Sequence, residues 1–503
     1  MTVFVRKILI RQKKTEAQNG GIMVLGELQP KEVFHYFEEI CGIAHGSGNV
    51  KGISDYCVTF AKEHKLKYRQ DEKFNVLIWK DGTAGYENSD AVMLQGHLDM
   101  VAVKEDGCTK DMEKEGLDLV VEGDYVSADK TSLGGDDGIA VAYALALLDS
   151  KDIPHPPLVA VLTVDEEIGM LGAVALDLSD VDAHIMMNID SEEEGIFLAG
   201  CAGGATVRCS IPVTCEQVDG VAVELAITGL TGGHSGMEII CQRANANVLM
   251  GRVLHEIEKE VTFSLTSING GEKDNAIAKF CNASLIVEKT DVDKCKMIVS
   301  RCQEVIAKEY ATTDPELKIT ATLGAEKECN SMNQASITKV LMALRFMPSG
   351  ILKMSTDIKE LVQTSLNLGI LNQNDQAVEL CYSVRSSVSS EKDEMIDRLE
   401  SLTEFLGGTC SISGKYPAWE YKKNSELRDR MVAVYEKMFG KKPEVQTIHA
   451  GVECGLMSEK IKDLDCVSFG PDIIDIHTTR EKLSISSVKR TWDYTLEVLK
   501  EMK

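Results

Sequence analysis

The sequence predicts an α/β domain with a mostly parallel central sheet, into which a second, α+β domain is inserted. Two observations support this architecture: short apolar runs alternate with helical stretches over the first 200 residues, and this pattern changes near residue 204 and returns near residue 416. The chain has 503 residues, of which 44% are hydrophobic, so it can form more than one core. We expect residues 23–203 and 416–503 to form the first domain and residues 204–415 the inserted one.

The elements of the first domain follow from the spacing of their apolar residues. Residues 30–41 (PKEVFHYFEEIC) and 53–64 (ISDYCVTFAKEH) predict amphipathic helices, and residues 139–150 (IAVAYALALLDS) predict an Ala-rich helix. Apolar runs that predict strands lie at residues 75–79, 91–101, 158–164 and 183–190. Apolar strands that alternate with helices indicate a mostly parallel sheet with both faces covered.

The inserted domain has a different pattern. Residues 221–230 (VAVELAITGL) alternate between apolar and polar, as in an antiparallel strand with one solvated face. Residues 394–406 (EMIDRLESLTEFL) place apolar side chains on one helical face. The first pattern then returns with a helix at residues 426–439 and an apolar run at residues 465–471.

Composition excludes several kinds of partner. The 54 basic and 79 acidic residues give a net charge of −25, which should repel nucleic acid and anionic membranes. No apolar run approaches the roughly 20 residues of a membrane helix. Fifteen cysteines without a CxxC pair favour reduced thiols and a cytoplasmic location. The basic residues 1–22 predict a disordered tail or sequence upstream of a start at Met23; a mitochondrial-type transit peptide is the alternative.

Polar side chains gather at or just past the ends of the predicted strands and in the adjoining Gly-rich turn. These clusters are His97 and Asp99, Asp136 and Asp137, Glu166 and Glu167, Asp190, and His477. In an open α/β sheet, ligands bind at the carboxyl edge of the strands. Imidazole and carboxylate together suit zinc, cobalt or manganese better than calcium or magnesium.

Each cluster alone has a simpler interpretation. Asp-Asp-Gly is most often a turn, the SEEEG stretch is typical of a solvated surface, and a single loop histidine is rarely a ligand. Their coincidence on one predicted sheet favours a metal site. Unpaired burial of these carboxylates would cost several kcal/mol each, whereas two cations would neutralise them.

The chain resembles the di-zinc exopeptidase superfamily and, within it, the aminoacyl-histidine dipeptidases (Xaa-His or cytosolic non-specific dipeptidases). The resemblance runs from about Leu28 to the C-terminus. It is carried by the motifs VFHYFEEIC, GSGNVKGISDY, LQGHLDMV, TVDEEIGMLGA, GLTGGHSGMEI, LVQTSLNLGI and IHAGVECG. It implies a di-zinc exopeptidase-type catalytic domain with an inserted lid domain for substrate binding.

The resemblance also implies a role for each cluster. Asp136 would bridge two divalent metals, zinc most often, with His97 and Asp190 on one metal and Glu167 and His477 on the other. Asp99 would accept the second ring N–H of His97, and Glu166 would be the general base. No role is implied for Asp165.

In the inserted domain, the resemblance implies three functional residues. His234 would donate to the tetrahedral oxyanion, Arg385 would bind the C-terminal carboxylate of the substrate, and Asn275 is a weaker candidate for a substrate contact. Glu453, in the HAGVECG loop, is another weaker candidate. The family resemblance is compatible with a homodimer, in which His234 would act within its own chain or across the interface.

The resemblance implies a metal-dependent dipeptidase that cleaves Xaa-His and other short dipeptides, β-Ala-His included, through a metal-bridging hydroxide. A related di-zinc deacylase or aminopeptidase is the alternative; a metal-binding protein that has lost catalysis is a third, against which the intact Glu166 argues. The sequence departs from the family pattern at Asp137, where relatives often have Asn, and in the HTTRE segment from His477. These departures leave the preferred substrate open.

Overall fold

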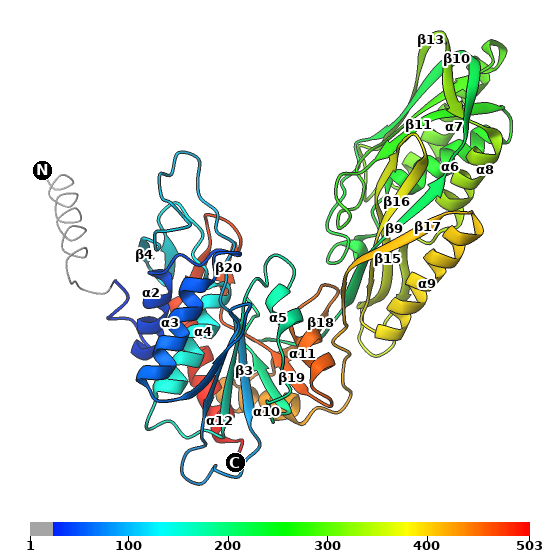
Figure 1. Ribbon diagram of the computed structural model, residues 1–503. Helices are drawn as coiled ribbons and strands as arrows, with labels where there is room; N and C mark the ends of the chain where they lie inside the picture. Colours follow the sequence, from blue (N-terminus) through cyan, green and yellow to red (C-terminus); the bar gives the residue numbers. More distant parts are fainter. Residues whose placement is uncertain (1–23) are drawn as a thin grey trace, which may run out of the picture. The chain divides into compact units, whose positions relative to one another are not determined.

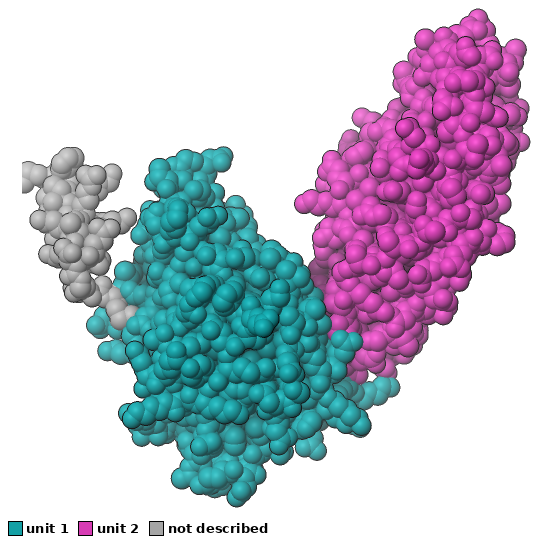
Figure 2. Space-filling model, viewed as in Figure 1, with its two compact units in different colours: residues 1–199, 422–446, 452–503 teal, residues 200–421, 447–451 magenta. Residues whose placement is uncertain are grey.

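The computed structural model describes residues 24–503, which form two compact units (Figures 1 and 2). Unit 1 holds the described residues up to Ala199 together with Lys422–Gln446 and Val452–Lys503; unit 2 holds Gly200–Tyr421 and Thr447–Gly451. The expectation for residues 1–22 lies outside the described part of the chain. Between residues 24 and 503, no helix has the length and apolar character needed to cross a membrane.

Unit 1 is built on an eight-stranded mixed sheet. In spatial order its strands are β1 (Lys67–Gln70), β2 (Val76–Lys80), β6 (Leu158–Thr163), β3 (Val92–His97), β7 (Ile185–Asn188), β19 (Asp465–Ser468), β8 (Ile196–Cys201) and β18 (Glu444–Ile448). A smaller sheet contains β20 (Ile473–Ile474), β21 (Lys482–Ser484), β5 (Tyr125–Ala128) and β4 (Leu119–Glu122).

The predicted α/β fold is confirmed, and the parallel arrangement holds for the centre of the sheet. Strands β6, β3, β7 and β19 are parallel neighbours. Strand β1 pairs antiparallel with β2, and β2 antiparallel with β6. The short β1–β2 connection explains this edge, because a parallel pair needs a longer crossover.

The helices of unit 1 are α2 (Lys31–Cys41), α3 (Lys51–Glu63), α4 (Gly135–Asp149), α5 (Leu171–Ala175), α10 (Glu426–Phe439), α11 (Cys454–Lys460) and α12 (Ile485–Lys500). Helix α4 packs against β3 and α2 and is buried on all sides from Ile139 to Leu148. Tyr143 of α4 stacks on Trp492 of α12 and donates a 2.8 Å hydrogen bond to the Val488 carbonyl. A helical stretch that is buried all round rarely carries unpaired charge, which explains why residues 139–148 are uncharged.

Unit 2 contains a nine-stranded sheet in which all the described pairs are antiparallel. Its strands, in spatial order, are β13 (Lys318–Met332), β10 (Cys215–Thr228), β12 (Cys281–Val287), β11 (Phe263–Gly270), β15 (Val362–Gln373), β16 (Ala377–Ser386), β9 (Gly203–Pro212) and β17 (Thr409–Tyr416), with β14 (Gly350–Met354) paired to β15. Its helices are α6 (Ala246–Glu258), α7 (Val292–Glu309), α8 (Gln334–Phe346) and α9 (Ser389–Phe405), with short 3₁₀ turns at η1 (Ile239–Cys241) and η2 (Lys289–Asp291). The apolar side chains of this sheet and its helices form a separate core.

The apolar residues of α4 lie in the core of unit 1, so their packing should contribute strongly to the stability of this unit. Leu145 in α4 is 0% exposed, whereas Leu171 in α5 is 50% exposed. We expect Leu145→Ala to lower the free energy of unfolding by about 2–5 kcal/mol, because it leaves a cavity in the core. Leu171→Ala should change it by less than about 0.5 kcal/mol. Urea unfolding followed by tryptophan fluorescence checks this, and equal losses for the two variants would contradict the assigned core.

Candidate metal centre

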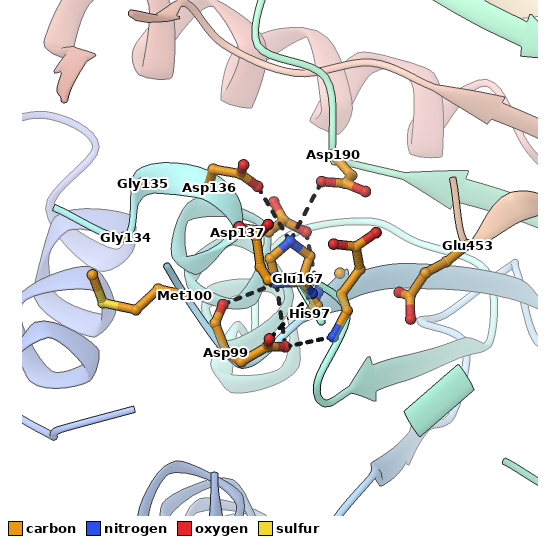
Figure 3. A network of polar contacts seen from close by, with 12 residues as sticks. His97, Asp99, Met100, Gly134, Gly135, Asp136, Asp137, Glu167, Asp190 and Glu453 are labelled. Atoms are coloured by element: carbon orange, nitrogen blue, oxygen red, sulfur yellow. Dashed lines mark hydrogen bonds and ion pairs between the residues drawn. The ribbon is translucent and has the colours of Figure 1, made fainter. Parts of the chain in front are cut away.

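The polar residues of unit 1 converge because three neighbouring parallel strands end at one edge of the sheet. His97 is the last residue of β3 and lies opposite Thr163, which ends β6. Glu166 and Glu167 follow β6, and Asp190 follows β7. Figure 3 shows carboxylates from these loops and from the start of α4 around the His97 ring. The sequence prediction that these side chains lie close together is confirmed.

Asp136 lies between two imidazoles. Its Oδ1 is 3.2 Å from Nε2 of His97, and its Oδ2 is 3.1 Å from Nε2 of His477. The same nitrogen of His477 is 2.8 Å from Oε1 of Glu167, and Nε2 of His97 is 3.7 Å from Oδ1 of Asp190. Each carboxylate oxygen of Asp136 therefore faces a different histidine.

The donor atoms fit divalent cations. One group that could hold an ion consists of His97, Asp136 and Glu167, and another of His97, Asp137 and Asp190; within each group the ligand atoms lie within 4.8 Å of one another. Among residues 24–503, no lysine or arginine forms an ion pair with these carboxylates. Within these residues the carboxylates pair with imidazoles instead, and a mixed imidazole and carboxylate set suits zinc and similar metals.

The pKa values reflect this concentration of acids. Burial, together with the nearby charges of Glu453 and Glu167, raises the pKa of Glu166 to about 8. Burial also raises the pKa of Asp190 well above its ordinary value. Although burial opposes it, hydrogen bonds with His477 and His97 hold the pKa of Asp136 below its usual range. These hydrogen bonds favour the ionised form of Asp136, in contrast to Glu166 and Asp190.

Asp99 holds the loop that follows β6. Its carboxylate accepts the backbone N–H of Glu166 at 3.0 Å and of Glu167 at 3.4 Å, and the hydroxyl of Ser47 at 2.8 Å. Nδ1 of His97 lies 2.9 Å from the Asp99 backbone carbonyl and 3.6 Å from its carboxylate. The ring is thus oriented mainly by the carbonyl, which differs from the expected ring-to-carboxylate contact, and the carboxylate positions the two glutamates.

Glu481 holds the loop that presents Asp136, and the sequence did not identify it. Its buried carboxylate accepts the backbone N–H groups of Leu133, Gly134 and Gly135 at 2.8, 3.1 and 2.8 Å. These are donors at the start of α4, where helix geometry leaves them without internal partners. Its position four residues after His477, a predicted ligand, is the feature of the sequence that could have identified it.

The remaining acids of this region have structural contacts. Asp165 adopts a left-handed conformation (φ 55°), and its carboxylate accepts the Gly48 N–H at 2.7 Å. Glu453 is 0% exposed and accepts hydrogen bonds from Gln95 (2.5 Å) and Thr163 (2.6 Å). The side chain of Glu453 is thus fully buried and hydrogen bonded inside unit 1, and its contact with substrate stays a prediction.

The other predicted site residues lie in unit 2. Nδ1 of His234 accepts the backbone N–H groups of Gly236 (3.3 Å) and Met237 (3.1 Å), so the neutral ring carries its hydrogen on Nε2. Asn275 is exposed, and its carbonyl accepts the Ser235 N–H beside His234. Arg385, in β16, is 9% exposed.

Comparison with known proteins agrees with this geometry. Residues 225–314 match the M20 peptidase dimerisation domain. The chain is 36% identical over 480 residues to the cytosol non-specific dipeptidase of Escherichia coli, covering 95% of this chain and 99% of the relative. The crystal structure of an aminoacylhistidine dipeptidase from Vibrio alginolyticus superimposes with a TM-score of 0.90 at 33% identity, covering 95% of this chain and 98% of the other. A Staphylococcus aureus tripeptidase (16% identity, TM-score 0.53, 95% and 99% coverage) shares the fold alone.

A mixed α/β sheet with imidazoles and carboxylates at the carboxyl ends of its parallel strands defines a metallohydrolase of the M20 peptidase class. The chain belongs to the cytosol non-specific dipeptidase family, whose Escherichia coli member it matches over nearly its full length. It is accordingly a hydrolase of the metallo-dipeptidase type.

Metal binding should release protons from the two imidazoles. Hydrogen bonds with Asp136 and then Glu167 raise the pKa of His477 to about 10 in the metal-free protein, so this ring is charged at pH 8. An imidazole binds a metal only in its neutral form, so zinc binding at pH 8 should release protons, and the affinity should rise as the pH approaches 10. Titration calorimetry in buffers of different ionisation enthalpy measures this release. His477→Ala should release about one proton fewer; an unchanged count would contradict the assignment.

Proposed function

We propose that this protein is a metal-dependent dipeptidase that hydrolyses Xaa-His and other short dipeptides, β-Ala-His included, in the cytoplasm. The observation that carries the proposal is Asp136, whose two carboxylate oxygens lie 3.2 and 3.1 Å from the rings of His97 and His477. The substrate class rests on the Escherichia coli relative, named a cytosol non-specific dipeptidase, and on the Vibrio alginolyticus aminoacylhistidine dipeptidase.

Two divalent cations, zinc by preference, fit the donor set. His97 and Asp190, which lie 3.7 Å apart, would hold one, His477 and Glu167, 2.8 Å apart, the other, and Asp136 would contribute to both. When bound, such a pair polarises the peptide carbonyl and makes water acidic enough to lose a proton near neutral pH. Two other carboxylates hold these ligands in position. Asp99 binds backbone N–H groups of the loop after β6, and Glu481 binds those of the loop that carries Asp136.

Glu166 is the proposed general base. Its side chain forms no hydrogen bond with any residue of the described chain, and its raised pKa of about 8 in the metal-free protein reflects burial among other acids. Metal charge beside it would favour the ionised form, which can take a proton from the attacking water. The same carboxyl then returns this proton to the leaving amine, so that one residue is base and acid in turn.

Unit 2 supplies the groups proposed for the rest of the substrate. Because Nδ1 of His234 accepts two backbone N–H groups, its Nε2–H is free to donate to the oxyanion that forms as the carbonyl is attacked. Arg385 would bind the C-terminal carboxylate, a task that suits a guanidinium. The match of residues 225–314 to a peptidase dimerisation domain supports a homodimer.

Adjacent glutamates should behave differently on mutation. Glu166→Gln keeps the shape but cannot take a proton, so kcat for β-Ala-His should fall by roughly 10²–10⁴-fold while two metals remain bound. Glu167→Gln removes an anionic ligand, so the protein should bind one metal weakly, and excess zinc should restore part of the activity. Dipeptide kinetics beside metal analysis by mass spectrometry separates these outcomes.

Glu193→Gln is the matched control, since Glu193 is exposed in the neighbouring SEEEG stretch. It should leave both turnover and metal content unchanged. Loss of metal by Glu166→Gln, with both metals retained by Glu167→Gln, would show that the two roles are reversed. Normal hydrolysis by both variants would reject the proposed mechanism.

A further inference from the structure

A second buried polar cluster lies within unit 2, centred on His449. This residue belongs to the segment Thr447–Gly451, which is part of unit 2 although the chain on either side of it belongs to unit 1. The Nε2 atom of His449 is 2.8 Å from the hydroxyl of Ser365 in β15. His449 is 6% exposed and Ser365 is 1% exposed, so both side chains are largely buried.

Two nitrogen atoms of this cluster lack partners. Neither Nδ1 of His449 nor Nε of Arg385 forms a hydrogen bond within residues 24–503, although both are buried. Arg385 donates through Nη1 to the hydroxyl of Tyr416 at 3.0 Å, and no carboxylate of the described chain pairs with its charge. A buried guanidinium with an unused N–H needs an anion, since leaving it unpaired costs several kcal/mol.

The backbone at Gly236 shows that these groups converge. A Cβ at this position would lie 2.5 Å from the His449 carbonyl oxygen, 3.1 Å from Cε1 of His234 and 3.2 Å from Nε of Arg385. Only a residue without a side chain leaves room for all three. The His234 loop, Arg385 and His449 therefore border the same small region of unit 2.

Ser365 determines which nitrogen of His449 carries hydrogen. His449 Nε2 is the one hydrogen-bond partner of the Ser365 hydroxyl in the part of the chain that the structure describes. A buried hydroxyl needs an acceptor for its hydrogen, so Ser365 donates to Nε2. Burial and the nearby charge of Arg385 lower the pKa of His449 to about 3, so the ring is neutral at pH 7. In a neutral ring whose Nε2 accepts, the unpartnered Nδ1 carries the hydrogen.

We propose that His449 is a specificity-determining residue, whose Nδ1–H donates to the same C-terminal peptide carboxylate that Arg385 binds, and that Ser365 holds the ring in this tautomer. The inference rests on the proposed function, because it takes the anion to be the carboxylate of the substrate. Arg385 would supply the charge, while His449 would supply a directed neutral donor. Together they would favour a carboxylate over the amide of a longer chain.

Two substitutions separate the ring nitrogens. The side-chain amide of Asn reaches about as far as Nδ1 and can keep the donor, whereas that of Gln reaches about as far as Nε2 and cannot. We expect His449→Gln to lower the preference in kcat/KM for a dipeptide over its C-terminal amide by roughly 10–100-fold, the scale of a hydrogen bond to a charged group. His449→Asn should retain most of the preference, and Ser365→Ala should lose part of it. His255→Gln, at a partly exposed position of unit 2, is the control.

A binding measurement removes the dependence on turnover. Calorimetric titration of the zinc-loaded protein with a phosphinic dipeptide analogue, as free acid and as amide, should show the same loss of preference in His449→Gln. A wild-type preference in this variant, with folding verified by its Tm, would overturn the inference. Arg385→Ala distinguishes the role of Arg385 from that of His449. If this variant keeps the preference for the free acid, the proposed carboxylate role of Arg385 fails. If Arg385→Ala abolishes the preference and His449→Gln does not, only the role of His449 fails.

Discussion

The structure of unit 1 depends on the burial of several carboxylates around two imidazoles. Asp136, between His97 and His477, is the centre of this arrangement. Burial, together with repulsion between these acids, raises the pKa of Asp190 and of Glu166 in the absence of cations. A pair of divalent cations would convert this repulsion into attraction, so the same residues that destabilise the metal-free protein should stabilise the loaded one.

Two further carboxylates hold the loops that carry the acids of this site. Asp99 accepts the backbone N–H groups of Glu166 and Glu167, and Glu481 accepts those at the loop before Asp136. Both act on the main chain, so they fix where the acidic side chains start. Ligands held by backbone contacts of this kind are positioned before a metal arrives, which reduces the ordering that binding requires.

Much of this could be predicted from the sequence. Apolar runs located strands β3, β6 and β7, and since parallel strands end at one edge, His97, Glu167 and Asp190 had to be neighbours. The antiparallel edge strands were not predicted, because periodicity does not reveal strand direction. The assignment of each ligand to a particular metal remains a prediction.

Contacts with the main chain and the burial of single side chains could not be predicted from the sequence. The family resemblance implied a contact between the Asp99 carboxylate and the His97 ring, but the backbone carbonyl of Asp99 lies closer to that ring. Glu453 was a candidate for a substrate contact, and its full burial inside unit 1 could not be predicted from the sequence. His449 lies four residues before Glu453 in the IHAGVECG motif. Its contact with Ser365 could not be predicted, because the two residues are distant in sequence and only the fold brings them together.

The most direct test of the central claim is anomalous X-ray diffraction at the zinc absorption edge, from crystals of the zinc-loaded protein. Two peaks roughly 3.5–4 Å apart should flank the Asp136 carboxylate, the spacing usual for metals that share a water. One should lie beside His97 and Asp190 and the other beside His477 and Glu167. A single peak, or two peaks that Asp136 does not connect, would contradict the assignment of Asp136 as the bridging ligand.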